Sequence, residues 1–335
     1  MLRRLRLPAT LACLALLAGC VPPAYRAPYP VTAVRLPRDE AAHPAPIEWW
    51  YTTGHLTDEQ GREYGFELTF FKLYTPPQAK LLGFVPAFWL ADKGQVGHFA
   101  VTDLSTGRFV MDQRADFWGY DASTSGRTLD VHLGDWKLED APIGHHLQAA
   151  AGGYALDLRL APAKPAAMHG SPPGIQSMGP GGVSYYYSYT RQWVSGAIGL
   201  QCGLFGCKTL KVTGQAWSDH QWGDFGVTGY AGWDWYSLQF DDDTELMLYL
   251  IRMPDGSFAH SAGSYITADG RTLPLAAHDF RVTATGQTWT SPRTGATYPM
   301  SWRVRVPAYD IDITVTPQMQ AQEMDTRATT GIVYW

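Results

Sequence analysis

Apolar and polar residues alternate with a period of two in most segments of this chain beyond residue 45. Clear examples are residues 66–70, 302–306 and 311–315, in which every second residue is apolar. Such alternation predicts β-strands with one buried face. Clusters rich in Asp and Gly between these segments, such as 58–61 and 254–256, are typical of tight turns. The pattern therefore predicts an all-β fold of many short antiparallel strands, as in sandwiches and barrels.

A weak internal repeat indicates two similar halves. An aromatic segment at 50–52 leads to an acidic turn at Asp58 and then to an apolar run, and residues 235–237 lead likewise through Asp241 to the apolar run 246–251. Chance similarity between two hairpins is the alternative explanation. From the repeat and the chain length of 335 residues we expect two domains, at residues 45–214 and 215–335.

The first twenty residues have the features of a targeting signal. A charged start with three arginines precedes the apolar stretch Leu11 to Ala18, which is too short to span a bilayer. Residues 17–20, Leu-Ala-Gly-Cys, resemble the lipobox of bacterial lipoproteins, which implies cleavage before Cys20 and a lipid on its sulfur. A plain secretory signal is the alternative. Residues 21–44 are rich in proline and are expected to form a stiff, extended tether.

This targeting signal also predicts a location. Val21 follows the lipobox cysteine, which resembles the sorting signal for the outer membrane. We therefore expect a lipid-anchored protein of the bacterial cell envelope, attached to the outer membrane and facing the periplasm.

Cys202 and Cys207 enclose a Gly-Leu-Phe-Gly loop that can turn tightly. In an oxidising compartment this spacing favours a local disulfide. A metal site is not expected there, because no further Cys or His stands at ligand spacing beside them.

Charge excludes one class of partner, and aromatic content indicates another. The formal net charge is -5 and no basic stripe occurs, which argues against nucleic acid as a partner.

Aromatic residues make up 13% of the chain and gather in three clusters at 48–51, 217–223 and 232–236, each beside an acid or a histidine. Rings next to titratable groups suit a dry pocket in which a carboxyl pKa can rise. We therefore expect an apolar small-molecule or lipid-like ligand, with acid chemistry as an option.

The same segments carry a resemblance to a known family. Residues 43–51, His-Pro-Ala-Pro-Ile-Glu-Trp-Trp-Tyr, look like the opening of the carotenoid 1,2-hydratase (hydroxyneurosporene synthase) family, whose members are often labelled predicted secreted hydrolases. Later motifs at 186–188, 217–220 and 232–235 follow in the family's order. The resemblance implies two tandem lipocalin-like β-barrels. Similar chains continue past Trp335 into a last strand, so the second barrel is expected to lack its closing strand.

Hydration of an isolated double bond needs a proton donor, a group that stabilises a carbocation and a base, but no cofactor. We predict Asp234, flanked by two tryptophans, as the proton donor, with Asp219 as the second choice. His220 is the predicted base, and it and Trp222 match positions implicated in catalysis in the resembled family. Asp219 as a structural carboxylate and His220 as a core histidine are the alternatives.

Four further aromatic residues are predicted to line the ligand pocket: Trp50, Trp233, Trp235 and Tyr187. Packing at the bottom of a barrel is the alternative role for the tryptophans. Two functions therefore compete. One is a cofactor-free hydratase acting on an isoprenoid-like ligand, and the other is a carrier that holds such a ligand unchanged.

Overall fold

The computed structural model describes residues 33–73, 80–81, 85–86, 94–178, 182–203, 206–224 and 230–335. Strands dominate these ranges, and helix is limited within them to two 3-10 turns at Arg38–Glu40 and Pro307–Tyr309. The all-β prediction is confirmed. None of the described helices is long and apolar enough to cross a membrane.

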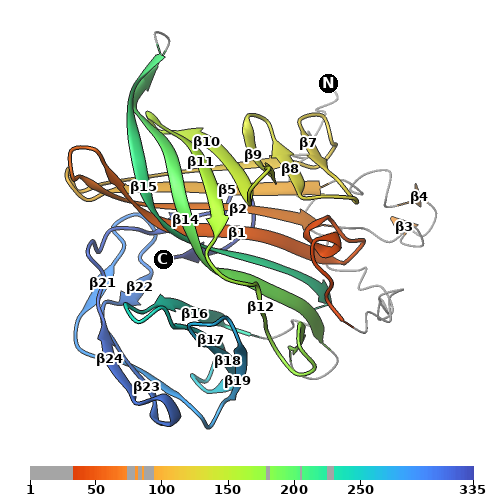
Figure 1. Cartoon of the computed structure of the whole chain (residues 1–335), viewed down its shortest axis with the longest axis vertical. Helices are drawn as coiled ribbons and strands as arrows, with labels where there is room; N and C mark the ends of the chain where they lie inside the picture. The colour runs from red at the N-terminus through yellow and green to blue at the C-terminus, as the bar shows by residue number, and fades with distance from the viewer. Residues whose placement is uncertain are drawn as a thin grey trace, which may run out of the picture.

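One large antiparallel sheet forms the first part of the molecule (Figure 1). Its strands run in the spatial order β6 (Arg108–Asp116), β5 (Gly94–Asp103), β2 (Glu63–Leu73), β1 (Ile47–Asp58), β15 (Gly206–Asp224), β14 (Val183–Gly203), β11 (Tyr154–Pro162), β10 (His145–Ala151), β9 (Trp136–Asp140), β8 (Asp130–Leu133) and β7 (Ala122–Thr124). Two short strands, β12 (Ala167–Met168) and β13 (Ile175–Ser177), pair with β14.

The sheet curls into a nearly closed barrel. Strands β5 and β6, from one end of the strand order, lie against β8 and β10 from the other. At Gly97 on β5 a Cβ atom would lie 2.9 Å from a methyl carbon of Leu133 and 3.2 Å from the Trp136 ring, so a glycine permits this approach. The lumen between these strands is filled by large side chains, among them Tyr64, Phe70 and Phe99.

Alternation along β1 decides which side chains enter the lumen. Every second residue from Glu48 to Asp58 is buried, while those between are more exposed. The neighbouring strand β15 is buried at every residue from 216 to 223, because both of its faces are covered. Its second face is covered by the C-terminal part of the chain, as the contact of Trp217 with Trp235 shows.

The C-terminal part has its own strands and core. One sheet contains β16 (Gly232–Gln239), β17 (Glu245–Arg252), β18 (Phe258–Ile266) and β19 (Thr272–Ala276), and a second contains β20 (Arg281–Ala284), β23 (Trp302–Val306) and β24 (Ile311–Val315). Leucines 246, 248 and 250 of the first sheet pack against Val304 and Val306 of the second.

Three small hairpins complete the described strands: β21 (Thr288–Thr290) with β22 (Thr297–Pro299), β25 (Met324–Asp325) with β26 (Val333–Tyr334), and β3 (Lys80–Leu81) with β4 (Val85–Pro86).

Both hairpins of the internal repeat are present, β1 with β2 and β16 with β17. The expected division at residues 214/215, however, falls inside β15. Gly214 and Gln215 both pair with β1, opposite Leu56 and His55, so the first sheet continues to Asp224. The division differs because the aromatic motif at 217–223 belongs to a strand of the barrel and not to the start of a second unit.

The expected tether also differs from the structure where it is described. Residues 1–32, with the targeting signal and Cys20, lie outside the described ranges. From Asp39 to Ala41 the chain is buried, and Trp50 Nε1 donates a hydrogen bond to the Glu40 carbonyl at 3.2 Å. Residues 39–41 are therefore part of the packed barrel, since burial outweighs the extended preference of a proline-rich segment.

The hairpin of β14 and β15 extends beyond its neighbours (Figure 1). At its tip the structure joins Cys202 and Cys207 by a disulfide, with their Cα atoms 4.1 Å apart. The bridge closes a hairpin whose own hydrogen-bonded pairing ends with Gly203 opposite Gly206.

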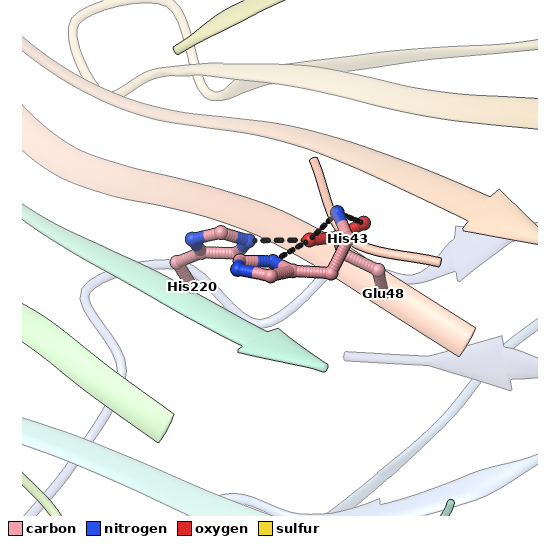
Figure 2. Close-up of side chains that lie close together, drawn as sticks. All are labelled: His43, Glu48 and His220. Atoms are coloured by element: carbon pink, nitrogen blue, oxygen red, sulfur yellow. Dashed lines mark hydrogen bonds and ion pairs between the residues drawn. The ribbon is translucent and has the colours of Figure 1, made fainter. Parts of the chain in front are cut away.

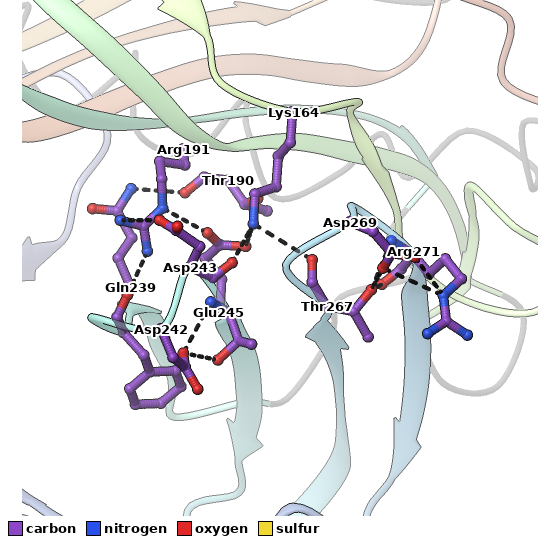
Figure 3. Close-up of polar contacts among 12 residues, drawn as sticks. Lys164, Thr190, Arg191, Gln239, Asp242, Asp243, Glu245, Thr267, Asp269 and Arg271 are labelled. Carbon is purple, nitrogen blue, oxygen red and sulfur yellow. Dashed lines mark hydrogen bonds and ion pairs between the residues drawn. The ribbon is translucent and has the colours of Figure 1, made fainter.

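A buried ion cluster fixes the C-terminal part against the barrel (Figure 3). Glu245, at the start of β17, accepts hydrogen bonds from Arg191 Nε at 2.8 Å and Lys164 Nζ at 2.9 Å. Arg191 Nη2 also donates to the Phe240 carbonyl at 2.8 Å. All three charged side chains are at most 6% exposed, so each charge depends on the others for compensation.

Replacing Glu245 by Gln is expected to lower the free energy of unfolding by about 3–5 kcal/mol, because two buried cations lose their anion. Urea denaturation followed by tryptophan fluorescence measures the loss. Asp269→Asn is the matched control, since Asp269 and Arg271 form an exposed pair. Equal denaturation midpoints for the two variants would contradict the role given to Glu245.

Candidate active site

Glu48 is a completely buried carboxylate on the inner face of β1. One of its oxygens accepts hydrogen bonds from His43 Nδ1 at 2.7 Å and from His220 Nε2 at 2.9 Å, as Figure 2 shows. The other accepts from the His43 backbone N–H at 2.9 Å and lies 3.4 Å from Lys72 Nζ. Burial alone would raise the pKa of Glu48, but these donors outweigh it and hold the pKa at about 2. Glu48 is therefore an anion at neutral pH.

Strand register brings these groups together from distant parts of the chain. Lys72 on β2 stands opposite Glu48, and His220 on β15 stands opposite Trp50. Because alternate residues share a face, Glu48 and Trp50 both point into the lumen, as do His220 and Trp222. Strand β14 then adds Tyr187, which stands opposite His220.

His220 connects Glu48 to a tyrosine. Its Nε2 lies against Glu48, which can only accept, so that nitrogen carries the proton. The Nδ1 atom of the neutral ring then accepts from the Tyr187 hydroxyl at 3.2 Å. Burial lowers the pKa of His220, which favours this neutral form. The result is a continuous hydrogen-bonded chain from Tyr187 through His220 to Glu48.

Aromatic rings surround the imidazole of His220. Trp50 stacks on it at 4.7 Å between ring centroids, and Trp222 lies at the same distance at a larger tilt. The ring of His43 stacks on Trp222 at 3.9 Å. These contacts hold the orientation of the imidazole and exclude water from it.

The hydrogen-bonded series Tyr187–His220–Glu48 reaches a cavity at its Tyr187 end. A cavity of about 360 Å³ is lined by Pro37, Glu40, Asp140, Ala141, Gly144, His145, Pro162 and Tyr189. A much smaller cavity of about 20 Å³ shares His145 and Tyr189 with it and is lined further by Trp50, Thr52, Leu129, Leu138, Tyr187, Ser218, Asp219 and His220. Tyr187 and His220 therefore line a small inner cavity that adjoins the larger one at His145 and Tyr189.

Asp219 lies on the other face of β15. Its side chain accepts hydrogen bonds from Trp217 Nε1 at 2.6 Å and from the Ser188 hydroxyl. Ser188 is bonded in turn to His169, whose second nitrogen lies 2.9 Å from the Ser264 hydroxyl on β18. Burial raises the pKa of Asp219 to about 6. This network lies where β18 packs against the barrel, so Asp219 has the place of a structural carboxylate.

Asp234 does not meet His220. It lies on β16, its side chain is 32% exposed, and its carboxylate is 3.6 Å from Arg252 Nε. Burial raises the pKa of Asp234, and Arg252 opposes that shift. The expectation that Asp234 and His220 face one enclosed cavity is corrected here, because the aromatic cluster at 232–236 belongs to a separate sheet.

The aromatic side chains predicted to bind a ligand fall into two groups, one beside His220 and one away from it. Trp50 and Tyr187 line the inner cavity beside His220, and Trp222 packs against that histidine. Trp235 instead packs against Tyr51 and Trp217 on the outer face of the barrel, and Trp233 is 51% exposed.

Residue-level reasoning missed Glu48, His43, Glu40, His145 and Tyr189. A signal existed for Glu48, because it alternates with Trp50 at the start of a strand whose inner face is apolar or small from there to Leu56. His43 was marked only as the first residue of the resembling motif, and Glu40 by nothing; both enter the site because residues 39–43 fold back over the barrel.

Three groups of side chains in the described chain bring possible metal-ligand atoms within 4.8 Å of one another: His43, Glu48 and His220; Glu40, Asp140 and His145; and Asp130, His132 and Glu139. The first group already shares protons in hydrogen bonds of 2.7 and 2.9 Å. The second lines the pocket, and the third lies near the surface. The prediction of a cofactor-free site remains a prediction.

Comparison with known proteins places the fold. Residues 27–335 match the AttH-like family. The chain belongs to the AttH-like family. It is similar to a crystal structure of a protein from Nitrosomonas europaea assigned as AttH, with 32% identity over 92% of this chain and 91% of that chain, at a TM-score of 0.79.

A more distant structure has the same fold. Kievitone hydratase from Nectria haematococca is 15% identical, over 88% of this chain and 83% of that chain, at a TM-score of 0.66. No curated protein matches the sequence. These matches confirm the AttH-like family and a β-barrel fold shared with kievitone hydratase, but they do not confirm the narrower resemblance to carotenoid 1,2-hydratases.

Glu48 gives the stability of the barrel a pH dependence. Its pKa falls from an ordinary 4.5 to about 2 on folding, so its stabilisation is present above pH 4.5 and is lost as the pH falls toward 2. The corresponding contribution at neutral pH is about 3 kcal/mol. Glu48→Gln should flatten the pH dependence of the unfolding free energy between pH 5 and 2, measured by denaturant titration. Parallel curves for wild type and variant would contradict this.

Proposed function

We propose that the protein adds water to a carbon–carbon double bond of a small, mainly apolar ligand. The observation that carries the proposal is the buried chain Tyr187–His220–Glu48, which ends at the inner wall of a pocket. Such a chain can hold and return a proton in a site shielded from bulk water. We place the double bond against the Tyr187 hydroxyl.

The proton donor in this proposal is the Tyr187 hydroxyl, with His220 as the base, and not a carboxylic acid. Glu48 and Glu40 both have a lowered pKa, because hydrogen bonds from neighbouring side chains outweigh the effect of burial. Both are therefore anions. A proton added to His220 is stabilised by the Glu48 anion, in the manner of an oriented imidazolium.

The proposed reaction balances within the Tyr187–His220 pair. The Tyr187 hydroxyl proton goes to one alkene carbon and water attacks the other. His220 Nδ1 takes the proton that this water releases, and then returns it to the Tyr187 oxygen. The ring of Trp50 lines the same cavity and can stabilise positive charge on the carbon through its π face. No further reactant is needed.

The volume of the larger cavity limits the size of the ligand that it can hold. A volume of about 360 Å³ is near the lower end for small-molecule sites. We infer that a short isoprenoid, or one end of a longer isoprenoid or lipid-like chain, occupies this larger cavity. It would reach the small inner cavity, lined by Leu129, Leu138 and Trp50, past the shared residues His145 and Tyr189. The fold shared with kievitone hydratase, a protein named for a hydration, supports this class of reaction.

Turnover distinguishes the hydratase from a carrier. His220→Gln should reduce hydration by about 10²–10⁴-fold while ligand binding persists. The measurement is mass spectrometry of a panel of isoprenoid alkenes, alcohols and ketones after incubation with the purified protein, with a gain of one water as the readout. Asp234→Asn is the control, and it should retain full activity because Asp234 lies outside the pocket.

Loss of activity in Asp234→Asn but not in His220→Gln would overturn the assignment of the site. Binding without any gain of water would favour the second candidate, a carrier of apolar ligands. The apolar walls of the inner cavity suit that function without any proton transfer.

We also propose that a lipid on Cys20 holds the protein at the outer membrane, facing the periplasm. Support comes from the sequence at 17–20 and from Val21. Cys20→Ala should move the protein from the membrane fraction to the soluble periplasmic fraction, measured by fractionation and immunoblotting. Cys13→Ala is the matched control and should leave the distribution unchanged. Membrane retention of Cys20→Ala would exclude the anchor.

A further inference from the structure

Glu40 is an ionised carboxylate in the wall of the larger cavity. Its side chain is 8% exposed, and one oxygen, Oε1, accepts the Tyr189 hydroxyl proton and lies 3.6 Å from His145 Nε2. Burial acts to raise the pKa of Glu40, but its contacts with His145 and Tyr189 lower it overall. Its other oxygen receives no hydrogen bond from any residue in the described part of the chain. This oxygen is not sealed from solvent, so it can accept a hydrogen bond from water or from a donor group of a ligand.

A second acidic side chain lies near Glu40, and no basic side chain balances the pair in the cavity lining. Asp140 and His145 offer ligand atoms within 4.8 Å of it. Among the described residues that line the two cavities, none is a lysine or an arginine. An anionic head group placed there would meet two carboxylates and no cation, whereas a donor or a cation would be attracted.

We propose that the Glu40–His145–Asp140 end of the pocket binds a cationic or hydrogen-bond-donating group and rejects carboxylates and phosphates. This rests on the proposed function only in using the same pocket. The double bond would lie at the inner end beside Tyr187, and the donor group at the outer end beside Glu40. Two sources share this chemistry, namely a hydroxyl or ammonium group of the organic ligand and a divalent metal ion held by the three side chains.

The test compares saturated ligands that cannot be hydrated, so its outcome does not depend on turnover. Alcohol, amine and carboxylic acid of one branched ten-carbon skeleton (3,7-dimethyloctane) are titrated into the full chain by calorimetry, in EDTA. We expect the amine and the alcohol to bind about 10- to 100-fold more tightly than the acid, as one charge-assisted hydrogen bond allows. Glu40→Gln should abolish this preference, because the amide keeps the shape but not the charge.

Two further variants separate charge from folding. Tyr189→Phe removes a donor from Glu40 without changing its charge, so the acid should still be rejected. Asp130→Asn changes an acidic residue outside both cavities and should bind all three ligands as wild type does. Unchanged thermal midpoints show that the variants are folded.

A separate titration with ZnCl₂ alone identifies the source of the cation. Binding that is lost in both Glu40→Gln and Asp140→Asn would identify a metal ion, whereas a head-group preference in EDTA identifies an organic group. Either result supports the proposal. Equal affinities for acid, alcohol and amine, together with no zinc binding that depends on Glu40, would overturn it.

Discussion

The burial of one ionised carboxylate constrains the centre of this barrel. Glu48 is removed from water completely, and its charge is tolerated only because His43, Lys72 and His220 all direct donors at it. Each donor belongs to a different segment, so the folding back of the N-terminal segment and the pairing of β2 and β15 with β1 are all needed at once. The orientation of His220 follows from this requirement, since the anion fixes which nitrogen holds the proton. The position of Tyr187 then determines where that proton can be delivered.

Strand β15 has a different role on each of its two faces. Toward the lumen, β15 presents His220 to the inner cavity with Trp222 packed against it, and on the outer face Asp219 anchors a network that reaches β18. The adjacent residues Asp219 and His220 both border the small inner cavity, yet their side chains bond to different partners because neighbours on a strand point to opposite faces. This explains why burial is high along the whole motif while only half of its residues can touch a ligand. It also explains why the predicted tryptophans do not all meet in one site. Trp50 lines the inner cavity, whereas Trp235 packs between the barrel and the C-terminal part of the molecule.

The electrostatic character of the pocket narrows the chemistry it can support. Glu40 and Glu48 are anions, and the proton that can move is the one shared by His220 and Tyr187. A site of this kind favours ligands that bring a donor to the outer end and an apolar, reactive segment to the inner end. The walls of Trp50, Leu129 and Leu138 suit the second of these requirements. Under the proposed function, affinity and reactivity are assigned to two adjoining cavities.

The sequence by itself determined the all-β class and the two aromatic hairpins, and it placed His220, Trp222, Trp50 and Tyr187 among the candidate site residues, because strand alternation and local composition are properties of neighbouring residues. It could not separate Asp234 from His220, since both stood beside tryptophans and only sheet pairing decides which clusters meet. Nor could it show that Glu40 and His43 complete the site, because a proline-rich segment carries no periodic signal. Those contacts exist only after the chain has folded over the open end of the barrel. Local pattern thus decided the elements, and long-range register and burial decided which charges came together.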